Sequence, residues 1–286
     1  MPLFVAFLCL VWGSTWYAIR ICLEVQPPLC SAALRFLIAG LAMAAIAPLL
    51  RQREAVPPPP AWLWLLTGVT NFAGSYGILY VAQTVVPSGV AAVLWAIFPL
   101  LMAGSGVLVL GERITKRQFA GFLVSFAGIA TVFGGSLGGI EPAQVGFAWL
   151  LLLSPIVSAT GTTLVKKYGG GTSSVLLNRN AMLFGAVLLT IAAFVGEDPL
   201  AMPWTWRATL ATLYLAVIGT SMTFGIYFWL LRTLPASRLA LISYVTPVLA
   251  MLIGTAVGDG TVDTLAWIGT ALVVFGVALV VKKVAR

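Results

Sequence analysis

The sequence predicts an all-α integral membrane protein whose ten transmembrane helices form two inverted five-helix repeats around a central cavity. Three observations lead to this prediction: the apolar composition, ten long apolar segments and an internal repeat. Of the 286 residues, 60% are hydrophobic and only 8% are charged, and the mean hydropathy is +1.05. Because about 25% of the residues of an ordinary globular domain are charged, this chain cannot build a water-soluble surface. The lipid bilayer is therefore its first expected partner.

Ten apolar segments are each long enough to cross a bilayer, which requires about 20 mainly apolar residues per helix. Together they use most of the chain and leave short loops, with no room for a soluble domain. The first segment has no basic stretch before it and no A-x-A-like site after it, so we expect it to remain as a span rather than be cleaved as a signal peptide. The predicted spans cover residues 3–22, 29–50, 61–82, 88–110, 117–135, 145–165, 173–195, 204–231, 236–257 and 264–281.

The charged residues predict the orientation of these spans. If the N-terminus lies inside, the inner loops and the C-terminal tail carry most of the 16 Lys and Arg residues, and the outer loops carry most of the 8 acidic residues. Such a Lys/Arg bias marks the cytoplasmic side. We therefore expect a multi-pass protein of the bacterial inner membrane with both termini cytoplasmic. The net charge of +8 is then a topology signal, and no nucleic-acid partner is expected.

The chain has three cysteines. Cys9 falls within the first span, where a small packing role is expected. Cys22 and Cys30 flank the first outer loop, so a disulfide and two free thiols are both open alternatives, since spacing alone does not establish a bridge.

An internal repeat relates the two halves, residues 1–135 and 136–286. A shift of 148 positions aligns Pro87 with Pro235 and Pro99 with Pro247. Each half holds five spans, and because five is odd the second copy enters the membrane from the opposite side. Inverted repeats of this kind are widespread in secondary transporters. The same shift pairs Gly77/Gly225, Gly106/Gly254, Gly121/Gly269 and Gly128/Gly276, whereas a shift of 144 pairs Ser14/Ser158 and Arg35/Arg179.

Several kinds of chemistry are missing from the sequence. The chain has no histidine, which excludes Ser–His catalysis, histidine-ligated zinc and histidine-ligated haem. It has no G-x-x-x-x-G-K-[ST] phosphate loop for ATP, and we expect no cofactor and no metal. No acidic residue lies deep in a span; Glu112 and Asp259 fall at span ends. Because proton-coupled carriers commonly use intramembrane carboxylates, a uniporter, facilitator or exchanger is favoured, with proton coupling through a helix-end acid as the alternative.

Two arginines enter the predicted spans at matching depths, Arg35 in the second and Arg179 in the seventh. Each lies about 9 Å from its helix end at 1.5 Å per residue. A long arginine can extend that far to the membrane interface, so one interpretation is an interfacial anchor. The other is a symmetry-related pair that holds gates through carbonyls or acids near helix ends.

Aromatic and polar residues within the spans predict either helix–helix hydrogen bonds or a cavity with aromatic walls and a few polar groups. Packing is the simpler interpretation for any one of them, and the set as a whole favours a substrate cavity. Pro99 and Pro247, near the middle of the fourth and ninth spans, predict either symmetric hinges or helices curved around a cavity. The candidate cavity residues are Trp12, Ser14, Trp16, Asn71, Tyr76, Tyr80, Trp95, Ser158, Phe224, Tyr227 and Tyr244.

A set of short motifs, in order and duplicated, resembles the drug/metabolite transporter superfamily and its ten-helix EamA-type exporters. The resemblance covers essentially the whole chain as two tandem copies. In the second copy Gly258-Asp259-Gly260 stands where a Gly-Glu pair is expected, which argues against an essential role for Glu112. The motifs are Trp12-Gly13-Ser14, Arg35-Phe36, Pro99-Leu100, Leu110-Gly111-Glu112-Arg113, Gly121 and Gly128.

This resemblance implies a basket of helices whose central cavity is formed by spans one, three, four, six, eight and nine. It also implies export of amino acids, other small metabolites or drugs by alternating access. The aromatic residues and the absence of a buried acid favour neutral or aromatic amino acids as the small-molecule substrate. A multidrug, nucleotide-sugar-like or other metabolite carrier of the same superfamily is the alternative, and a membrane-embedded enzyme or a scaffold is less favoured. A monomer is expected, with a dimer as the alternative.

Overall fold

Helices account for all the regular structure in the part of the chain that the computed structural model describes, which comprises residues 2–111, 115–136, 142–233, 236–259 and 264–281. Within these ranges, consecutive helical elements form ten rods, one of which has a turn at residues 96–97, and each rod overlaps one of the ten predicted spans. By length and composition, six helices within the described ranges could cross a membrane, and Val245–Val257 and Thr264–Leu279 are shorter apolar helices. The predicted all-α membrane fold is confirmed.

Prolines fix where several of the rods begin. Pro27, Pro60 and Pro87 each stand directly before a helix, with ψ between 139° and 148°. Proline suits this place because its fixed φ and missing N–H cost nothing at a helix N-terminus. The elements are α1 (Pro2–Leu23), α2 (Pro28–Glu54), α3 (Ala61–Thr67), η1 (Gly68–Gly74), α4 (Ser75–Gln83), α5 (Ser88–Trp95), α6 (Phe98–Leu110), α7 (Lys116–Ser136), α8 (Pro142–Tyr168), α9 (Ser174–Gly196), α10 (Trp206–Leu213), η2 (Tyr214–Met222), α11 (Thr223–Thr233), α12 (Ala236–Val257) and α13 (Thr264–Val281).

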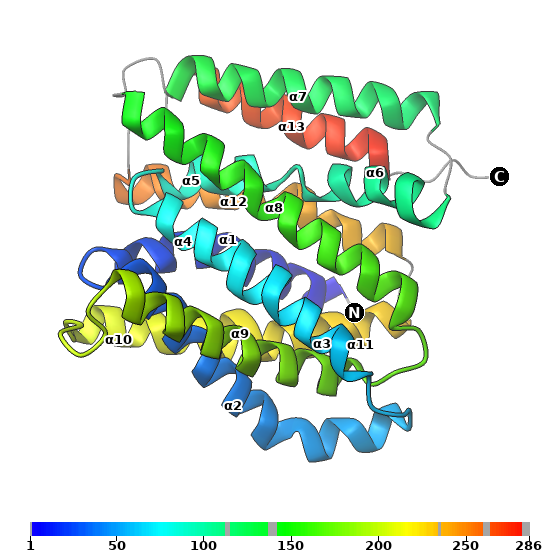
Figure 1. The fold of residues 1–286 in the computed structure, drawn as a ribbon. Helices are drawn as coiled ribbons and strands as arrows, with labels where there is room; N and C mark the ends of the chain where they lie inside the picture. The colour runs from blue at the N-terminus through cyan, green and yellow to red at the C-terminus, as the bar shows by residue number, and fades with distance from the viewer. Residues whose placement is uncertain (1, 112–114, 137–141, 234–235, 260–263, 282–286) are drawn as a thin grey trace.

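Helices of one half pack against their counterparts in the other half. In Figure 1, α7 lies along α13 at one edge of the molecule and α2 lies with α9 at the other edge. Between these edges α4 packs on α8, and α1 packs on α12, which also contacts α5. These contacts join the two halves at both edges of the molecule and between them.

Small residues bring α7 and α13 into close contact. A Cβ atom on Gly128 would lie 2.7 Å from the carbonyl oxygen of Gly269, and one on Gly276 would lie 2.6 Å from that of Gly121. The 148-residue shift exchanges these two contacts, as expected for antiparallel helices around an approximate two-fold axis. Such glycine contacts allow membrane helices to approach closely.

Two carboxylates join α2 and α9 reciprocally at their ends. Glu197, directly after α9, accepts hydrogen bonds from the backbone N–H groups of Leu29 and Cys30 in the first turn of α2, each at 2.8 Å. Glu54, the last residue of α2, accepts hydrogen bonds from the Ser173 and Ser174 hydroxyls at the start of α9. Each carboxylate thus lies at a helix N-terminus, where the dipole favours negative charge.

Two π-helical segments, which the sequence analysis did not predict, interrupt the third and eighth rods. They are η1 and η2, and their ranges overlap when one is shifted by 148 positions. In η2 the hydroxyl of Thr220 donates to the Leu215 carbonyl at 2.8 Å, and that of Ser221 donates to the Ala216 carbonyl at 3.1 Å. Both bonds reach back five residues, which matches the wider π turn. Segments of this kind occur frequently at functional sites.

The two prolines predicted as hinges have different local structures. The fourth rod breaks after Trp95, and Pro99 stands in the first turn of α6. Its symmetry mate Pro247 lies inside the continuous helix α12. A hinge role for either proline stays a prediction. Cys9, Cys22 and Cys30 are buried free thiols, so the structure contains no bridge between Cys22 and Cys30.

Candidate substrate cavity

A cavity of about 450 Å³ lies among the helices of the two halves. This volume falls within the range of roughly 300–1,000 Å³ that is typical of small-molecule sites. Besides the predicted spans, α2 and the start of α9 contribute to the lining, and none of the described lining residues is acidic. The predicted site residues found in the lining are Trp12, Trp16, Arg35, Asn71, Tyr76, Trp95, Pro99, Ser158, Phe224, Tyr227 and Pro247.

Three predicted site residues lie outside the lining. The Ser14 hydroxyl instead donates to the Val11 carbonyl at 2.9 Å and lies 2.6 Å from the Tyr214 hydroxyl. Tyr80 is completely buried behind the wall, where its hydroxyl accepts a hydrogen bond from Arg35. Arg179 donates from Nε to the amide oxygen of Asn180 at 2.9 Å. The side chain of Tyr244 lies outside those that the structure describes.

The sequence analysis missed a polar strip that the start of α9 adds to the cavity. Ser174 and Asn178 both line it, and the Asn178 amide donates to the Ser174 carbonyl at 2.8 Å. Their i,i+4 spacing places them on one helix face. This spacing, next to Arg179, was the one indication in the sequence of a polar helix face. It does not indicate whether that face contacts the cavity or another helix.

Aromatic rings form walls of the cavity, and two of the indole N–H groups, those of Trp12 and Trp95, are bonded within the protein. The Trp12 ring lies 5.5 Å from the Tyr227 ring and 6.1 Å from the Phe224 ring, and its N–H donates to the Thr223 hydroxyl at 3.2 Å. Across the cavity, the Trp95 N–H donates to the Ser154 hydroxyl at 3.1 Å. Because these N–H groups are occupied, the indoles offer mainly their apolar and π surfaces to a ligand.

Arg35 supplies a positive charge to the otherwise apolar wall. Its side chain is buried, with only 2% exposure, and it lines the cavity. Nε donates to the Thr220 hydroxyl at 3.1 Å, and Nη1 donates to the Tyr80 hydroxyl at 3.3 Å. The guanidinium carbon lies 4.9 Å from the centre of the Tyr76 ring. Arg35 is therefore held by protein groups at the cavity wall, which is not the arrangement expected of an interfacial anchor.

Asn71 provides a second polar position, held in place by its neighbours. Its amide nitrogen donates to the Thr162 hydroxyl at 2.8 Å, and its oxygen accepts from the Thr70 hydroxyl at 2.9 Å. A Cβ atom on Gly161 would lie 1.9 Å from the Thr70 hydroxyl oxygen and 2.3 Å from the Asn71 oxygen. Glycine at position 161 therefore makes room for this polar contact between η1 and α8.

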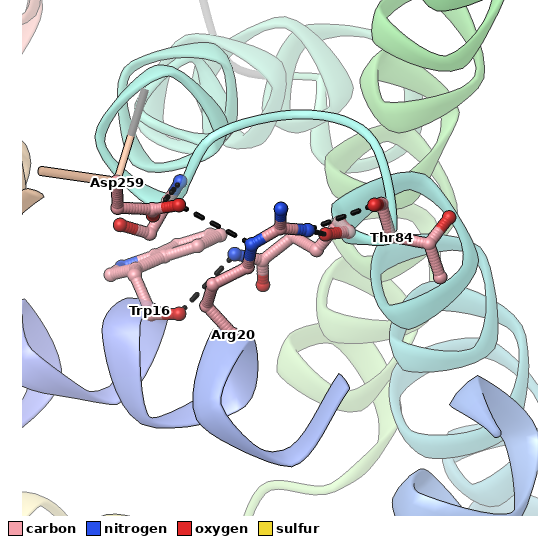
Figure 2. Close-up of polar contacts among 6 residues, drawn as sticks. Trp16, Arg20, Thr84 and Asp259 are labelled. Carbon is pink, nitrogen blue, oxygen red and sulfur yellow. Dashed lines mark hydrogen bonds and ion pairs between the residues drawn. The ribbon is translucent and has the colours of Figure 1, made fainter. Parts of the chain in front are cut away.

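A group of polar contacts lies beside the cavity wall, and we call it the Arg20 cluster. It comprises Arg20, Gln83, Thr84, Ser88 and Asp259. In Figure 2 the guanidinium of Arg20 lies between Asp259 and Thr84. Its Nε lies 3.3 Å from the Asp259 carboxylate, and its Nη1 donates to the backbone carbonyls of Gln83 and Thr84 at 3.0 and 2.8 Å. The second carboxylate oxygen of Asp259 accepts from the Ser88 N–H at 2.9 Å. The cluster thus joins α1, the turn between α4 and α5, and the end of α12.

The Arg20 cluster also connects to the cavity wall. The Gln83 amide donates to the Trp16 carbonyl at 3.3 Å, and the Trp16 ring lines the cavity. At the opposite end the lining continues to Gly169, Thr172 and Ser174 in the turn before α9. The lining therefore extends from Trp16, beside the Arg20 cluster, to the turn before α9, and the members of the cluster are not part of it. We call the end of the cavity beside this cluster the Arg20 end.

The comparisons with known proteins define the class of this protein as a multi-pass membrane transporter. The EamA-like transporter family model matches residues 1–134 and 146–282. The chain belongs to the EamA-like transporter family.

Several similar proteins carry transporter names. The uncharacterized inner membrane transporter YedA of Escherichia coli K12 is 34% identical, over 98% of this chain and 90% of its own. The uncharacterized transporter YvbV of Bacillus subtilis is 27% identical, over 98% and 91% of the two chains. One solved crystal structure matches with a TM-score of 0.70 at 20% identity, over 97% and 94% of the two chains, which shows the fold alone.

Proposed function

We propose that this transporter is a secondary carrier that exports small metabolites, with neutral and aromatic amino acids as its substrates. The observation that carries the proposal is the cavity, whose walls are aromatic and whose described lining residues include no Asp or Glu. An aromatic side chain gains both apolar burial and ring–ring contact in such a site. A permanently cationic drug would find no carboxylate there to replace its lost hydration, so the multidrug alternative is less favoured.

Alternating access is the proposed mechanism. The Arg20 cluster closes one end while the cavity lining extends to the turn before α9 at the other. Inverted halves support such a cycle, because exchanging their conformations would close the open end and open the closed one. The Lys/Arg bias favours a cytoplasmic position for Arg51, Lys166 and Lys167. On that orientation the present conformation faces inward and the Arg20 cluster is the outer closure.

Counterflow in proteoliposomes tests the proposed substrate class. Vesicles loaded with an unlabelled mixture of amino acids should accelerate uptake of labelled phenylalanine, tyrosine or leucine, and should not accelerate uptake of lysine or of a quaternary ammonium drug. Protein-free vesicles and vesicles loaded with buffer are the controls. Uptake of the drug cation without uptake of any amino acid would contradict the amino-acid assignment and favour the multidrug alternative.

A further inference from the structure

We infer that Arg35 is the carboxylate-binding residue of the cavity, and that an acidic group on the ligand is the partner of this buried charge. The inference deepens the proposed function and rests on it, because it assumes that the cavity holds the transported molecule. It has a specific consequence for binding: the ligand must have a carboxylate and does not need an amino group.

Arg35 is a charge placed where charge is costly. It lies seven residues into α2, about 10 Å along the helix at 1.5 Å per residue, and is 2% exposed. Ionisable residues inside a membrane protein almost always face the interior or a cavity, where they pair with another group or mark the path of a substrate. Arg35 faces the cavity, so the question is what pairs with it.

The protein orients the guanidinium without neutralising it. Both hydrogen-bond acceptors, the hydroxyls of Thr220 and Tyr80, are uncharged, and so are the nearby rings of Tyr76 and Phe36. A guanidinium has five N–H donors, and within the described part of the chain Nη2 makes no hydrogen bond. Among the described residues the ion pairs of arginine are Arg20–Asp259 and Arg207–Glu24, so no carboxylate of those residues pairs with Arg35.

The repeat shows that this arrangement is not a requirement of the fold. Arg179 is the counterpart of Arg35, yet it lies outside the cavity lining and bonds to its neighbour Asn180. The 148-residue shift relates Thr220 to Phe72 and Tyr80 to Phe228, so both positions equivalent to the hydroxyl-bearing residues around Arg35 hold phenylalanine. The hydroxyl pair that orients Arg35, one hydroxyl from each half, therefore has no equivalent for Arg179.

A carboxylate fits this position in both charge and shape. Arginine forms paired N–H···O bonds with carboxylates, and such bonds are stronger than those between neutral groups. The apolar body of the ligand would then contact the rings of Trp12 and Phe224, which line the same cavity. Since no described lining residue is acidic, an ammonium group on the ligand has no ionic partner.

Three probes of equal ring size separate these contributions. They are L-phenylalanine, 3-phenylpropanoate, which lacks the amino group, and phenethylamine, which lacks the carboxylate. Binding is measured on the purified full-length protein by ligand-induced thermal stabilisation, and by competition with counterflow of labelled phenylalanine. We expect both carboxylates to bind and to compete, and phenethylamine to do neither. Tight binding of phenethylamine, or no binding of either carboxylate to the folded protein, would overturn the inference.

Variants assign the effect to Arg35. Arg35→Gln should weaken binding of 3-phenylpropanoate at least tenfold, the loss of a charge-assisted contact of about 1.5–3 kcal/mol. Thr220→Val and Tyr80→Phe keep the charge and remove one orienting bond each, so each should weaken binding about fivefold even if Arg35→Gln does not fold. Arg207→Gln, which removes an exposed arginine that is not part of the cavity lining, should leave binding unchanged. Unchanged affinity in all three cavity variants would contradict the inference.

The results also separate this inference from the proposed function. If 3-phenylpropanoate binds through Arg35 but no amino acid undergoes counterflow, the carboxylate site stands and the amino-acid assignment fails. If phenylalanine counterflow is the same in the wild type and in folded Arg35→Gln, the amino-acid assignment stands and the carboxylate site fails.

Discussion

At the scale of single residues, the cavity depends on side chains whose polar atoms are held by neighbours. Trp12, Trp95, Asn71 and Arg35 each donate a hydrogen bond to a hydroxyl group of the protein. These bonds fix the rings and the guanidinium before a ligand arrives. A preorganised site loses less side-chain entropy on binding, so single substitutions should affect affinity more than folding.

Trp12→Ala is expected to weaken the binding of aromatic substrates. The substitution removes the ring that contacts both Tyr227 and Phe224, and an aromatic contact contributes about 0.5–1.5 kcal/mol beyond area burial. The concentration of phenylalanine that gives half-maximal counterflow should rise about five- to tenfold. Trp206→Ala is the matched control, because that tryptophan is 74% exposed at the start of α10. An equal effect in both variants would contradict the position of the site.

Asp259→Asn is expected to weaken the closure at the Arg20 end. The carboxylate is 7% exposed and pairs with Arg20, and loss of such a partly exposed pair costs about 1 kcal/mol after solvent screening. The population open at that end should increase about two- to fivefold. This increase in the open population can be measured with a cysteine at the lining position Thr15. The cysteine should be labelled faster by a membrane-impermeant maleimide added from the Arg20 side. Glu24→Gln disrupts the looser Arg207–Glu24 pair of 3.9 Å and should leave the labelling rate unchanged.

Sequence reasoning reached many of these residues but could not order them in space. Tyr76 and Tyr80 share a helix face by their i,i+4 spacing, yet Tyr76 lines the cavity and Tyr80 lies behind it against Arg35 of α2. Which helix covers each tyrosine depends on tertiary packing. The pattern of spacing along one span carries no information on that packing.

At the scale of elements, the spans were predictable and their interruptions were not. Bilayer thickness sets the length of an apolar segment, so hydropathy located α1, α2 and α9 to within a few residues. The π segments η1 and η2 differ from an α-helix in that their hydrogen bonds span five residues instead of four. The amino-acid composition of these segments does not distinguish a π-helix from an α-helix. Their equivalent positions in the two halves are seen only in the structure.

The reciprocal carboxylates of α2 and α9 should stabilise the joined halves. Glu197→Gln weakens two charge-assisted bonds to the Leu29 and Cys30 N–H groups, and we expect a loss of about 1–2 kcal/mol in stability. The thermal unfolding midpoint in detergent should fall by several degrees, and Glu54→Gln should act in the same direction. Glu24→Gln removes a charge whose partner is 3.9 Å away and is the control. An unchanged midpoint in both cap variants would show that these bonds do not stabilise the pair.

At the scale of the whole molecule, the two halves are related but not equivalent. The α7–α13 contact at Gly121, Gly128, Gly269 and Gly276 is close to symmetric. The fourth rod is broken before Pro99 whereas α12 is continuous through Pro247. An inverted-repeat carrier requires both approximate symmetry and a difference between its halves. The symmetry allows the halves to exchange conformations, and the difference defines the asymmetric state that is populated.

Reversible locking of the Arg20 end is the measurement that tests the alternating-access account most directly. Cysteines replace Arg20 and Asp259, whose side chains meet across the closed end, and a short bifunctional thiol reagent that can be cleaved by reductant joins them. The account predicts that cross-linking abolishes phenylalanine counterflow and that reduction restores it, whereas each single-cysteine variant treated in the same way retains flux. Counterflow that continues at full rate with the Arg20 end covalently closed would contradict it.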